Sequence, residues 1–230
     1  MQEDKLLLEQ IFISKKTITE MMIDRGYINT NSYLPFNLFY ETFKDTEINN
    51  KNCSLDLEFV KLNDNNDINL TEIEKNTKFY EEVMSEDNIQ NKIYVKYLFN
   101  DKKPTEKEIV KKILLQKGFI KENDNILFVH CAGKELSDKV DNIYEHFHIS
   151  RLLFNITNHK LVPKHELLTK SQVINLKLSM NLKTIYQLPS IQKDDAISKY
   201  FNAKVGDVFK IYRNSKTTLE HICYRVVING

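Results

Sequence analysis

Glycine and proline are scarce in this chain, and it has no long apolar run. There are 5 glycines and 4 prolines among 230 residues, while apolar residues make up 41%, including 13 Phe and 11 Tyr. This composition is typical of a folded protein rich in regular structure. No apolar run approaches the roughly 18 residues of a membrane-spanning helix, and the first residues, Met1 to Asp4, are acidic where a signal peptide would be basic. We therefore expect an intracellular protein, or one packaged from inside a cell, with no membrane partner.

Cysteine is also rare. Cys53, Cys131 and Cys223 are odd in number and far apart, and they form no paired Cys-x-x-Cys spacing. A disulfide framework requires an even number of cysteines, and a zinc site built on paired cysteines requires a closer spacing. We expect these residues to be reduced thiols in the core.

The charge is distributed unevenly between the two halves of the chain. Residues 150–230 carry 13 Lys+Arg against 5 Asp+Glu, a balance of +8, whereas residues 1–149 carry 20 against 27, a balance of −7. Much of the acidity lies between Glu41 and Gln90, where 13 acids face 5 lysines. The length allows one large or two small domains, and the asymmetry favours two domains with different partners.

The first half has the pattern of an α/β domain with a small sheet. Apolar residues at helical spacing between Leu8 and Met22 predict a first helix that ends at Arg25-Gly26. A second helix within Ser32–Phe43 begins near Pro35. The predicted strand Ile93–Phe99, the helix after it and the predicted strand Asn125–Val129 follow one another, and this order implies a right-handed parallel crossover. The remaining predictions are strands at Leu55–Lys61, Ile93–Phe99 and Asn125–Val129, a loop at Asn63–Asn69, and a helix capped by Thr105 and Glu108 and stopped by Gly118.

The second half is organised around Asn158–Thr169, which reads NHKLVPKHELLT. Pro163 lacks a backbone donor and favours extended geometry at Val162, so Leu161 to Lys164 should form an exposed edge or connecting segment. The other predicted elements are a strand over Leu152–Ile156, a helix Ser171–Met180 with a Thr169/Gln172 capping box, a break at Leu188-Pro189, a short helix from Asp195 to Phe201, a turn at Gly206-Asp207, and antiparallel strands Val208–Arg213 and Ile222–Val227. The overall expectation is α/β, with α+β character across the whole chain.

Several of these segments resemble, in the right order, the small subunit that eukaryotic and archaeal RNA polymerases share, called subunit five in eukaryotes. The resemblance rests on Asn158–Thr169, Leu188–Ile191, Asp195–Gly206, Asp207–Arg213 and Tyr224–Val227, and on Ile18–Tyr27 in the first half. The sequence departs from the family pattern at Ala196, Asn202, Val205 and Asn214-Ser215-Lys216. Alanine is acceptable in a first helical turn capped by Asp195, and asparagine tolerates the left-handed conformation that glycine would supply.

The resemblance implies a non-catalytic structural subunit with no cofactor, no metal and no catalytic residue. Residues 1–149 would form a jaw domain with a small restriction-nuclease-like sheet near downstream duplex DNA. Residues 150–230 would form a smaller α+β assembly domain with a mixed or antiparallel sheet that docks on the largest polymerase subunit and its neighbours. Because both halves are present, the resemblance implies a eukaryotic polymerase in the nucleus, or a viral polymerase in the virion and at a cytoplasmic replication site.

Two sets of contact residues follow from this resemblance. The turn Cys131–Lys139 matches in position a DNA-facing turn of the family, which makes Lys134 and Lys139 candidates for phosphate contacts that do not read bases. A solvated surface lysine is the alternative for these positions. The candidates for the subunit interface are His159, Leu161, Val162, Pro163, Lys164, His165, Leu188, Pro189, Asp195, Gly206, Arg213, Tyr224 and Arg225.

Three other functions compete with this interpretation. A restriction-type nuclease needs acids and a lysine around a divalent metal, but Asp56, Glu58 and Lys61 have the wrong spacing, and Ile93–Lys96 has no acid beside its lysine. A free-standing transcription regulator that mimics the subunit stays open. A zinc site could be formed by His130, Cys131, His146 and His148, but without paired cysteines these are better interpreted as polar residues at a domain junction. His159 and His165 have no acid or nucleophile in a suitable arrangement around them, so we expect them to make contacts and not to act in catalysis.

Overall fold

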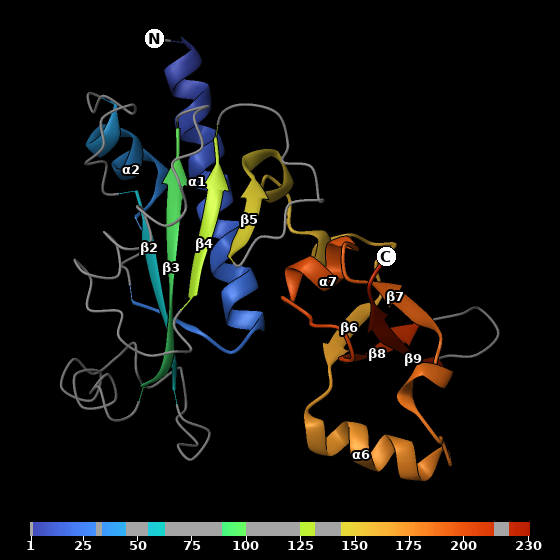
Figure 1. Ribbon diagram of the computed structural model, residues 1–230. Helices are drawn as coiled ribbons and strands as arrows, with labels where there is room; N and C mark the ends of the chain where they lie inside the picture. Colours follow the sequence, from blue (N-terminus) through green and yellow to red (C-terminus); the bar gives the residue numbers. More distant parts are fainter. Residues whose placement is uncertain are drawn as a thin grey trace. The chain divides into compact units, whose positions relative to one another are not determined.

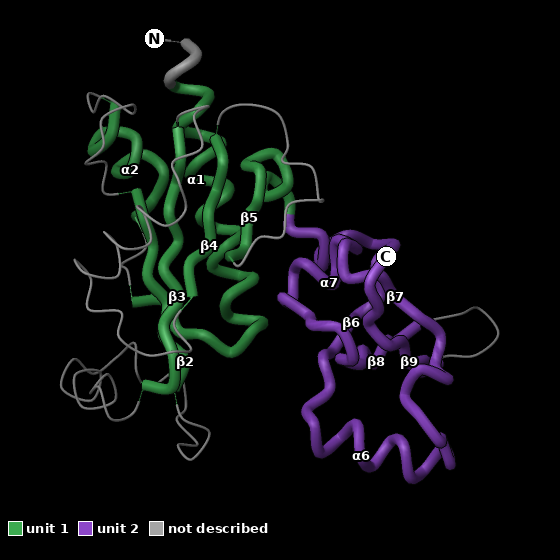
Figure 2. The backbone as a smooth tube through the Cα atoms, viewed as in Figure 1, with its two compact units in different colours: residues 1–154 green, residues 155–230 purple. Residues whose placement is uncertain are grey.

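The chain divides into two compact units, residues 1–154 and 155–230 (Figure 2). The computed structural model describes residues 2–30, 34–44, 55–62, 89–99, 125–131, 144–213 and 221–230. The boundary between the units lies between Phe154 and Asn155, whereas the composition pattern placed the division of the domains after residue 149. Ile149 and Leu152 are buried in a short helical turn that contacts the first helix, so this turn belongs to the first unit.

The first unit begins with a long helix, α1 (Gln2–Asp24), which confirms the predicted first helix. Leu8, Ile11 and Ile18 are fully buried at helical spacing. The helix ends at Gly26, whose φ of +83° lies in the left-handed region that glycine adopts without strain. Helix α2 (Phe36–Phe43) follows Pro35, as predicted, and packs the rings of Phe36 and Phe39 against Phe12 of α1.

A five-stranded mixed sheet completes the first unit, and α1 lies along it (Figure 1). The strands are β1 (Ile28–Asn29), β2 (Leu57–Leu62), β3 (Ile89–Leu98), β4 (Asn125–His130) and β5 (Glu145–His148), in the order β1-β2-β3-β4-β5. The pairs β1–β2 and β2–β3 are antiparallel, while β3–β4 and β4–β5 are parallel. The predicted parallel pairing of β3 with β4 is confirmed. The predicted helix Thr105–Gly118 and the loop Asn63–Asn69 lie outside the described residues.

The two faces of this sheet pack differently because successive side chains of a strand point to opposite faces. Tyr97 of β3 meets α1, where its hydroxyl shares a buried hydrogen bond with Ser14 Oγ at 2.9 Å. Tyr94, Ile126 and Phe128 form a separate buried cluster. These residues occupy alternate positions to Tyr97, Leu127 and Val129 along β3 and β4, so both faces of the sheet are apolar.

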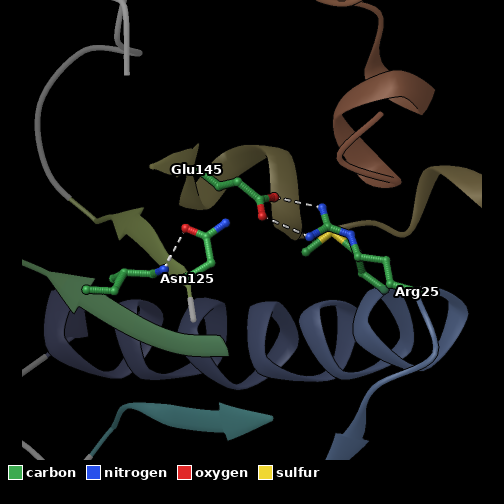
Figure 3. Close-up of polar contacts among 5 residues, drawn as sticks. Arg25, Asn125 and Glu145 are labelled. Atoms are coloured by element: carbon green, nitrogen blue, oxygen red, sulfur yellow. Dashed lines mark hydrogen bonds and ion pairs between the residues drawn. The ribbon is translucent and has the colours of Figure 1, made fainter. Parts of the chain in front are cut away.

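A bidentate ion pair joins the end of α1 to β5 (Figure 3). The guanidinium nitrogens of Arg25 donate to Glu145 Oε1 at 3.2 Å and to Glu145 Oε2 at 2.9 Å. The two side chains are only 5% and 12% exposed. Arg25 Nη2 also lies 3.6 Å from Met21 Sδ on the preceding turn of the helix. The arginine predicted as a helix-terminating cation therefore also ties α1 to β5.

The predicted strand over Leu152–Ile156 is wrong. The structure has two 3-10 helices there, η2 (Ile149–Leu152) and η3 (Ile156–Asn158). His148 Nδ1 accepts from Ser150 N, and Asn155 Oδ1 accepts from Thr157 N, so a side chain caps each turn at its start. Such local side-chain acceptors favour turns over strand pairing, and they override the apolar run between them.

The second unit is built on a four-stranded mixed sheet. Its strands are β6 (Lys164–Leu167), β7 (Ser190–Gln192), β8 (Val208–Arg213) and β9 (His221–Ile228), in the order β6-β8-β9-β7. The predicted antiparallel pairing of β8 with β9 is confirmed, β6 is antiparallel to β8, and β7 is parallel to β9. Both sheets are thus mixed, and the chain has the α+β class that the sequence predicts.

Helices cover both faces of this second sheet. Helix α6 (Lys170–Ser179) has the predicted Thr169/Gln172 capping box, and its Leu176 packs with Leu188, Val208 and Val226. Helix α7 (Ala196–Tyr200) is capped by Asp195 as predicted, and its Ile197 packs in a second cluster with Phe209, Ile211 and Val227. A 3-10 turn, η4 (Ile185–Gln187), precedes β7. Among the helices that the structure describes, none is long and apolar enough to cross a membrane.

Candidate functional site

The most exposed large apolar side chain described in the second unit is Leu161, at 83%. It lies in a turn over residues 159–162, closed by a hydrogen bond from Val162 N to His159 O at 2.9 Å. His159 Nδ1 accepts from Leu161 N at 3.2 Å, which holds the same turn. The predicted edge or connecting segment Leu161–Lys164 is thus a connecting turn followed by β6 from Lys164, and the histidine side chain provides a local acceptor that favours the turn.

The strand that follows, β6, lies at the edge of its sheet, in agreement with the argument from Pro163. One edge of β6 pairs with β8, and the other edge is the outer edge of the four-stranded sheet. We call residues 159–167, the turn together with β6, the edge segment. It combines one very exposed leucine with an edge strand in a small sheet.

His165 in the edge segment is suited to contact and not to acid-base chemistry. Its Nδ1 donates to the carbonyl of Pro163 at 2.7 Å. Burial lowers the pKa of His165, the cations of Arg213 and Arg225 lower it further, and the Pro163 carbonyl and Asp195 oppose these effects. The net result is a histidine that stays neutral at physiological pH.

On the opposite face of β6, a polar row crosses to β8. Tyr212 donates its hydroxyl proton to Glu166 Oε2 at 2.7 Å. The ammonium groups of Lys164 and Lys210 lie 5.6 Å and 4.9 Å from the centre of the Tyr212 ring. The hydrogen bond to Tyr212 raises the pKa of Lys210. Glu166, Lys210 and Tyr212 were not predicted as site residues, since their meeting depends on the register between β6 and β8, which alternation in each strand does not specify.

Some of the interface candidates have clear structural roles in the fold. Leu188 is only 8% exposed and belongs to the core beneath α6. Asp195 Oδ1 accepts from Ile197 N at 2.9 Å as the cap of α7. Gly206 has a φ of +94°, which fits the predicted turn. Leu188 acts from the core, whereas Asp195 is exposed and Gly206 is half-buried, and both support local turns of the chain.

The other candidates lie closer to the surface. Pro189 is exposed, and its carbonyl accepts from Val226 N. Arg213 is exposed at the end of β8, and the half-buried Arg225 donates from Nη1 to Ser190 O at 3.3 Å. Tyr224 is half-buried beside the cluster under α6. The predicted set is therefore divided between surface and core, and the charges of Asp195, Arg213 and Arg225 all act on His165.

The candidate DNA contacts, Lys134 and Lys139, lie outside the described residues. The strands on either side of them carry a pair of stacked histidines, in which His130 Nε2 and His146 Nδ1 share a hydrogen bond at 3.0 Å. In the part of the chain that the structure describes, no three His, Cys, Asp or Glu side chains are grouped so that they could hold a metal ion. The structure thus brings His130 and His146 together without a completed ligand set.

The cysteines that the structure describes are free thiols. Cys131 and Cys223 are both half-buried, and Cys53 lies outside the described residues. Burial raises the pKa of Cys131 to about 12. At neutral pH this thiol is protonated and a poor nucleophile.

Lys96 has an acid beside it in the folded chain, although none is adjacent to it in the sequence. Asp56, just before β2, lies with its Oδ2 2.6 Å from Lys96 Nζ on β3. The same oxygen accepts from the Tyr94 hydroxyl at 2.6 Å, and Oδ1 accepts from Tyr97 N at 3.2 Å. Burial, followed by this hydrogen bond, raises the pKa of Tyr94. The carboxylate accepts from three protein donors on β3, which makes it an anchor between β2 and β3.

Comparisons with known proteins show that the sequence is similar to RNA polymerase subunits. Residues 154–227 match the family model described as RNA polymerase Rpb5, C-terminal domain. The chain is 28% identical over 244 residues to DNA-directed RNA polymerases I, II, and III subunit RPABC1 of Caenorhabditis briggsae, covering 99% of this chain and 100% of that protein. It is 42% identical over 81 residues to DNA-directed RNA polymerase subunit Rpo5 of Sulfolobus acidocaldarius, covering 35% of this chain and 95% of that protein. The RPABC1 protein of Caenorhabditis elegans is 27% identical over 240 residues, again across 99% of this chain and 100% of that protein.

Proposed function

Since this chain belongs to the RNA polymerase subunit family that includes RPABC1 and Rpo5, we propose that it is a structural, non-catalytic subunit of a multisubunit DNA-directed RNA polymerase. One observation carries the proposal. The similarity to the nematode subunits runs through 99% of this chain and all of theirs, so it includes both compact units and not only a shared domain. An Asp56 carboxylate held by Tyr94, Lys96 and the Tyr97 amide is consistent with a structural role for the first sheet.

The second unit would dock on the largest polymerase subunit through the edge segment. Support comes from the exposure of Leu161 and from the position of β6 at the end of its sheet, where a partner can cover both. The +8 balance of residues 150–230 suits an acidic partner surface. The other exposed candidates, Pro189 and Arg213, would lie nearer the rim of such an interface.

A pull-down with matched variants tests the docking. Tagged protein expressed in its native source should bring down the largest polymerase subunit, and Leu161→Asp should reduce the recovery by about tenfold or more, because a buried carboxylate costs several kcal/mol at an apolar contact. Leu38→Asp, at a position of α2 that is also exposed (53%) and lies outside the second unit, is the control and should leave recovery unchanged. Failure of the unsubstituted protein to recover the largest subunit would reject the assignment.

The first unit would form part of the jaw beside downstream duplex DNA, with Lys134 and Lys139 as phosphate contacts. Such contacts make affinity depend on salt and not on sequence. In reconstituted polymerase, Lys134→Glu should weaken binding to the downstream duplex and lower its salt slope by about one. Lys16→Glu, an equal charge change at an exposed position of α1, is the control. An unchanged slope for Lys134→Glu would remove that lysine from the interface.

The proposal also makes the chain a stoichiometric component. Quantitative mass spectrometry of the purified polymerase should find one copy of this chain for each largest subunit, whereas a regulator that mimics the subunit would be present in a smaller amount. A cellular polymerase of this kind would lie in the nucleus, in keeping with its eukaryotic relatives. A virus-encoded one would be found in the virion and at the cytoplasmic replication site.

A further inference from the structure

Helix α6 has a second apolar side that does not face the core. Val173 and Leu176 pack towards the sheet, but Ile174 and Leu178 are 59% and 74% exposed. Residues four apart lie on the same face of a helix, so these two aliphatic side chains form one outward stripe. We call Ile174 and Leu178, with the exposed lysines beside them at positions 170 and 177, the α6 face.

The helix that carries this stripe has charges of one sign only, those of Lys170 and Lys177. Residues 167–193 contain no aspartate or glutamate. The same stretch contains four lysines: Lys170, Lys177, Lys183 and Lys193. An aliphatic stripe flanked by lysines on a helix that carries no acid is complementary to an apolar stripe bordered by carboxylates.

We propose that the α6 face binds an acidic amphipathic helix of another protein. The aliphatic residues of that helix would cover Ile174 and Leu178, and its flanking carboxylates would face Lys170 and Lys177. This binding site goes beyond the proposed function, because none of these four residues belongs to the edge segment. The subunit would then have two separate docking surfaces in its second unit.

Other occupants fit the α6 face less well. A twofold contact between two copies of this chain would place lysines of one copy against lysines of the other. A helix of 10 residues is about 15 Å long and offers only two outward aliphatic side chains, which is a small apolar area for insertion into a membrane surface. Nucleic acid phosphates would attract the lysines but would leave Ile174 and Leu178 in water.

The position is favourable for mutation because the stripe is separate from the core of the unit. Leu176 and Val173 hold α6 on the sheet, and the Thr169/Gln172 capping box fixes its start. Alanine has a higher helix propensity than isoleucine and about the same as leucine or higher. The double variant Ile174→Ala/Leu178→Ala should therefore keep the fold while removing the apolar part of the site.

The first experiment measures binding of a defined probe to the full-length protein. A fluorescent, helix-stabilised peptide with one leucine stripe flanked by glutamates should bind, and the same peptide with lysines in place of the glutamates should bind at least tenfold more weakly. Ile174→Ala/Leu178→Ala should weaken binding of the acidic peptide by about tenfold or more, as removal of central apolar contacts does. Leu161→Ala, a truncation at the most exposed leucine described in the same unit, is the matched control and should leave this affinity unchanged. Equal binding of both peptides, or no effect of the double variant, would overturn the proposal.

The second experiment locates the partner in the assembled polymerase. A photo-crosslinking amino acid is placed at position 178 in one sample and at position 161 in another, and the cross-linked peptides are identified by mass spectrometry. We expect position 178 to capture a peptide richer in acidic than in basic residues, and to capture a different segment from the one captured at position 161. Capture of lipid, nucleic acid or a second copy of this chain at position 178, or no capture there, would overturn the inference. Absence of the largest subunit at position 161 would instead count against the proposed docking of the edge segment.

Discussion

At the scale of single residues, burial controls how Cys131 reacts. Burial raises the pKa of Cys131 to about 12, so its thiolate is very scarce at neutral pH. We predict that iodoacetamide modifies Cys131 in the native protein at about one-hundredth of its rate in the urea-unfolded chain, or more slowly. Peptide-resolved mass spectrometry of samples quenched over time measures both rates. Similar rates in the folded and unfolded states would show that the thiol is accessible and ionised.

His165 links stability to pH. Burial lowers its pKa in the folded state, while in the unfolded chain a histidine takes up a proton near pH 6.5. Between these two pKa values the unfolded state binds more protons, so the free energy of unfolding decreases as the pH falls below about 6.5. We predict that this decrease, measured by urea unfolding from about pH 7.5 to about pH 5.5, is smaller in His165→Gln than in the unsubstituted protein.

The comparison with the variant isolates this histidine because the other histidines contribute equally to both proteins. The carbonyl of Pro163 and the carboxylate of Asp195 partly offset burial, and the cations of Arg213 and Arg225 add to it. An identical pH dependence in both proteins would show that His165 is as easily protonated in the folded state as in the unfolded chain.

Local residue chemistry could be predicted where one residue decides the conformation. Asn202 has a φ of +50°, the left-handed conformation expected where the family pattern has glycine nearby. Ala196 begins α7 under the Asp195 cap, also as expected. The contact between Asp56 and Lys96 could not be predicted, because it joins residues 40 positions apart through the register of β2 and β3.

At the scale of elements, the ion pair between α1 and β5 carries a large share of the connection between them. Arg25 and Glu145 are 5% and 12% exposed, so removal of one partner leaves a buried charge. We predict that Arg25→Met lowers the free energy of unfolding by about 3 kcal/mol. The exposed pair of Lys44 and Glu41 is the control, and Lys44→Met should change stability by less than about 1 kcal/mol. Urea unfolding followed by circular dichroism measures both.

A double variant separates the charge from the packing. Because two well-packed apolar residues avoid the desolvation of both ions, Arg25→Met/Glu145→Met should recover most of the stability that Arg25→Met loses. A double variant as unstable as the sum of the single variants would show that the two side chains contribute independently.

The elements were predictable where a repeated pattern is long and were missed where pairing or capping decides. Helix α1 follows from its apolar periodicity, β3 from its β-forming residues, and β4 from its continuous apolar run. β7 has only three residues, directly after Pro189, and its strand state depends on parallel pairing with β9. The apolar residues at 152–156 suggested a strand, but His148 and Asn155 cap turns there, a competition that apolar periodicity does not register.

At the scale of the whole molecule, the sequence motifs indicated the resemblance to the polymerase subunit, but they did not show which of their residues are exposed. The string Asn158–Thr169 and the segments after it indicated the polymerase subunit, and the match of residues 154–227 supports the same family. The same motif contains Leu161, which is exposed, and leads to Leu188, which is in the core. The motifs contain residues that stabilise the fold as well as residues that could contact a partner. The exposure of each side chain in the structure is needed to tell the two groups apart. The α6 face lies within the matched residues 154–227 but outside the segments that carried the resemblance, and it is evident only from the exposure of its side chains.

The division into two units predicts that the second can fold without the first. Residues 155–230 have their own sheet, with apolar clusters on both of its faces. The archaeal relative is matched over 95% of its length by only 81 residues, so a protein of this family can consist of little more than one such unit. We predict that a fragment of residues 155–230 unfolds cooperatively in urea, because a two-faced core supplies the burial that a small domain needs. Its midpoint should coincide with one of two unfolding transitions in the full-length protein, which near-ultraviolet circular dichroism can follow.

The variant Phe209→Ala opens a cavity in the fully buried core of the second unit. It should lower the free energy of unfolding for that transition by about 3 kcal/mol or more and leave the other transition in place. A single transition that moves as a whole in Phe209→Ala would mean that the two units unfold as one, and a fragment without a cooperative transition would mean that the second unit depends on the first.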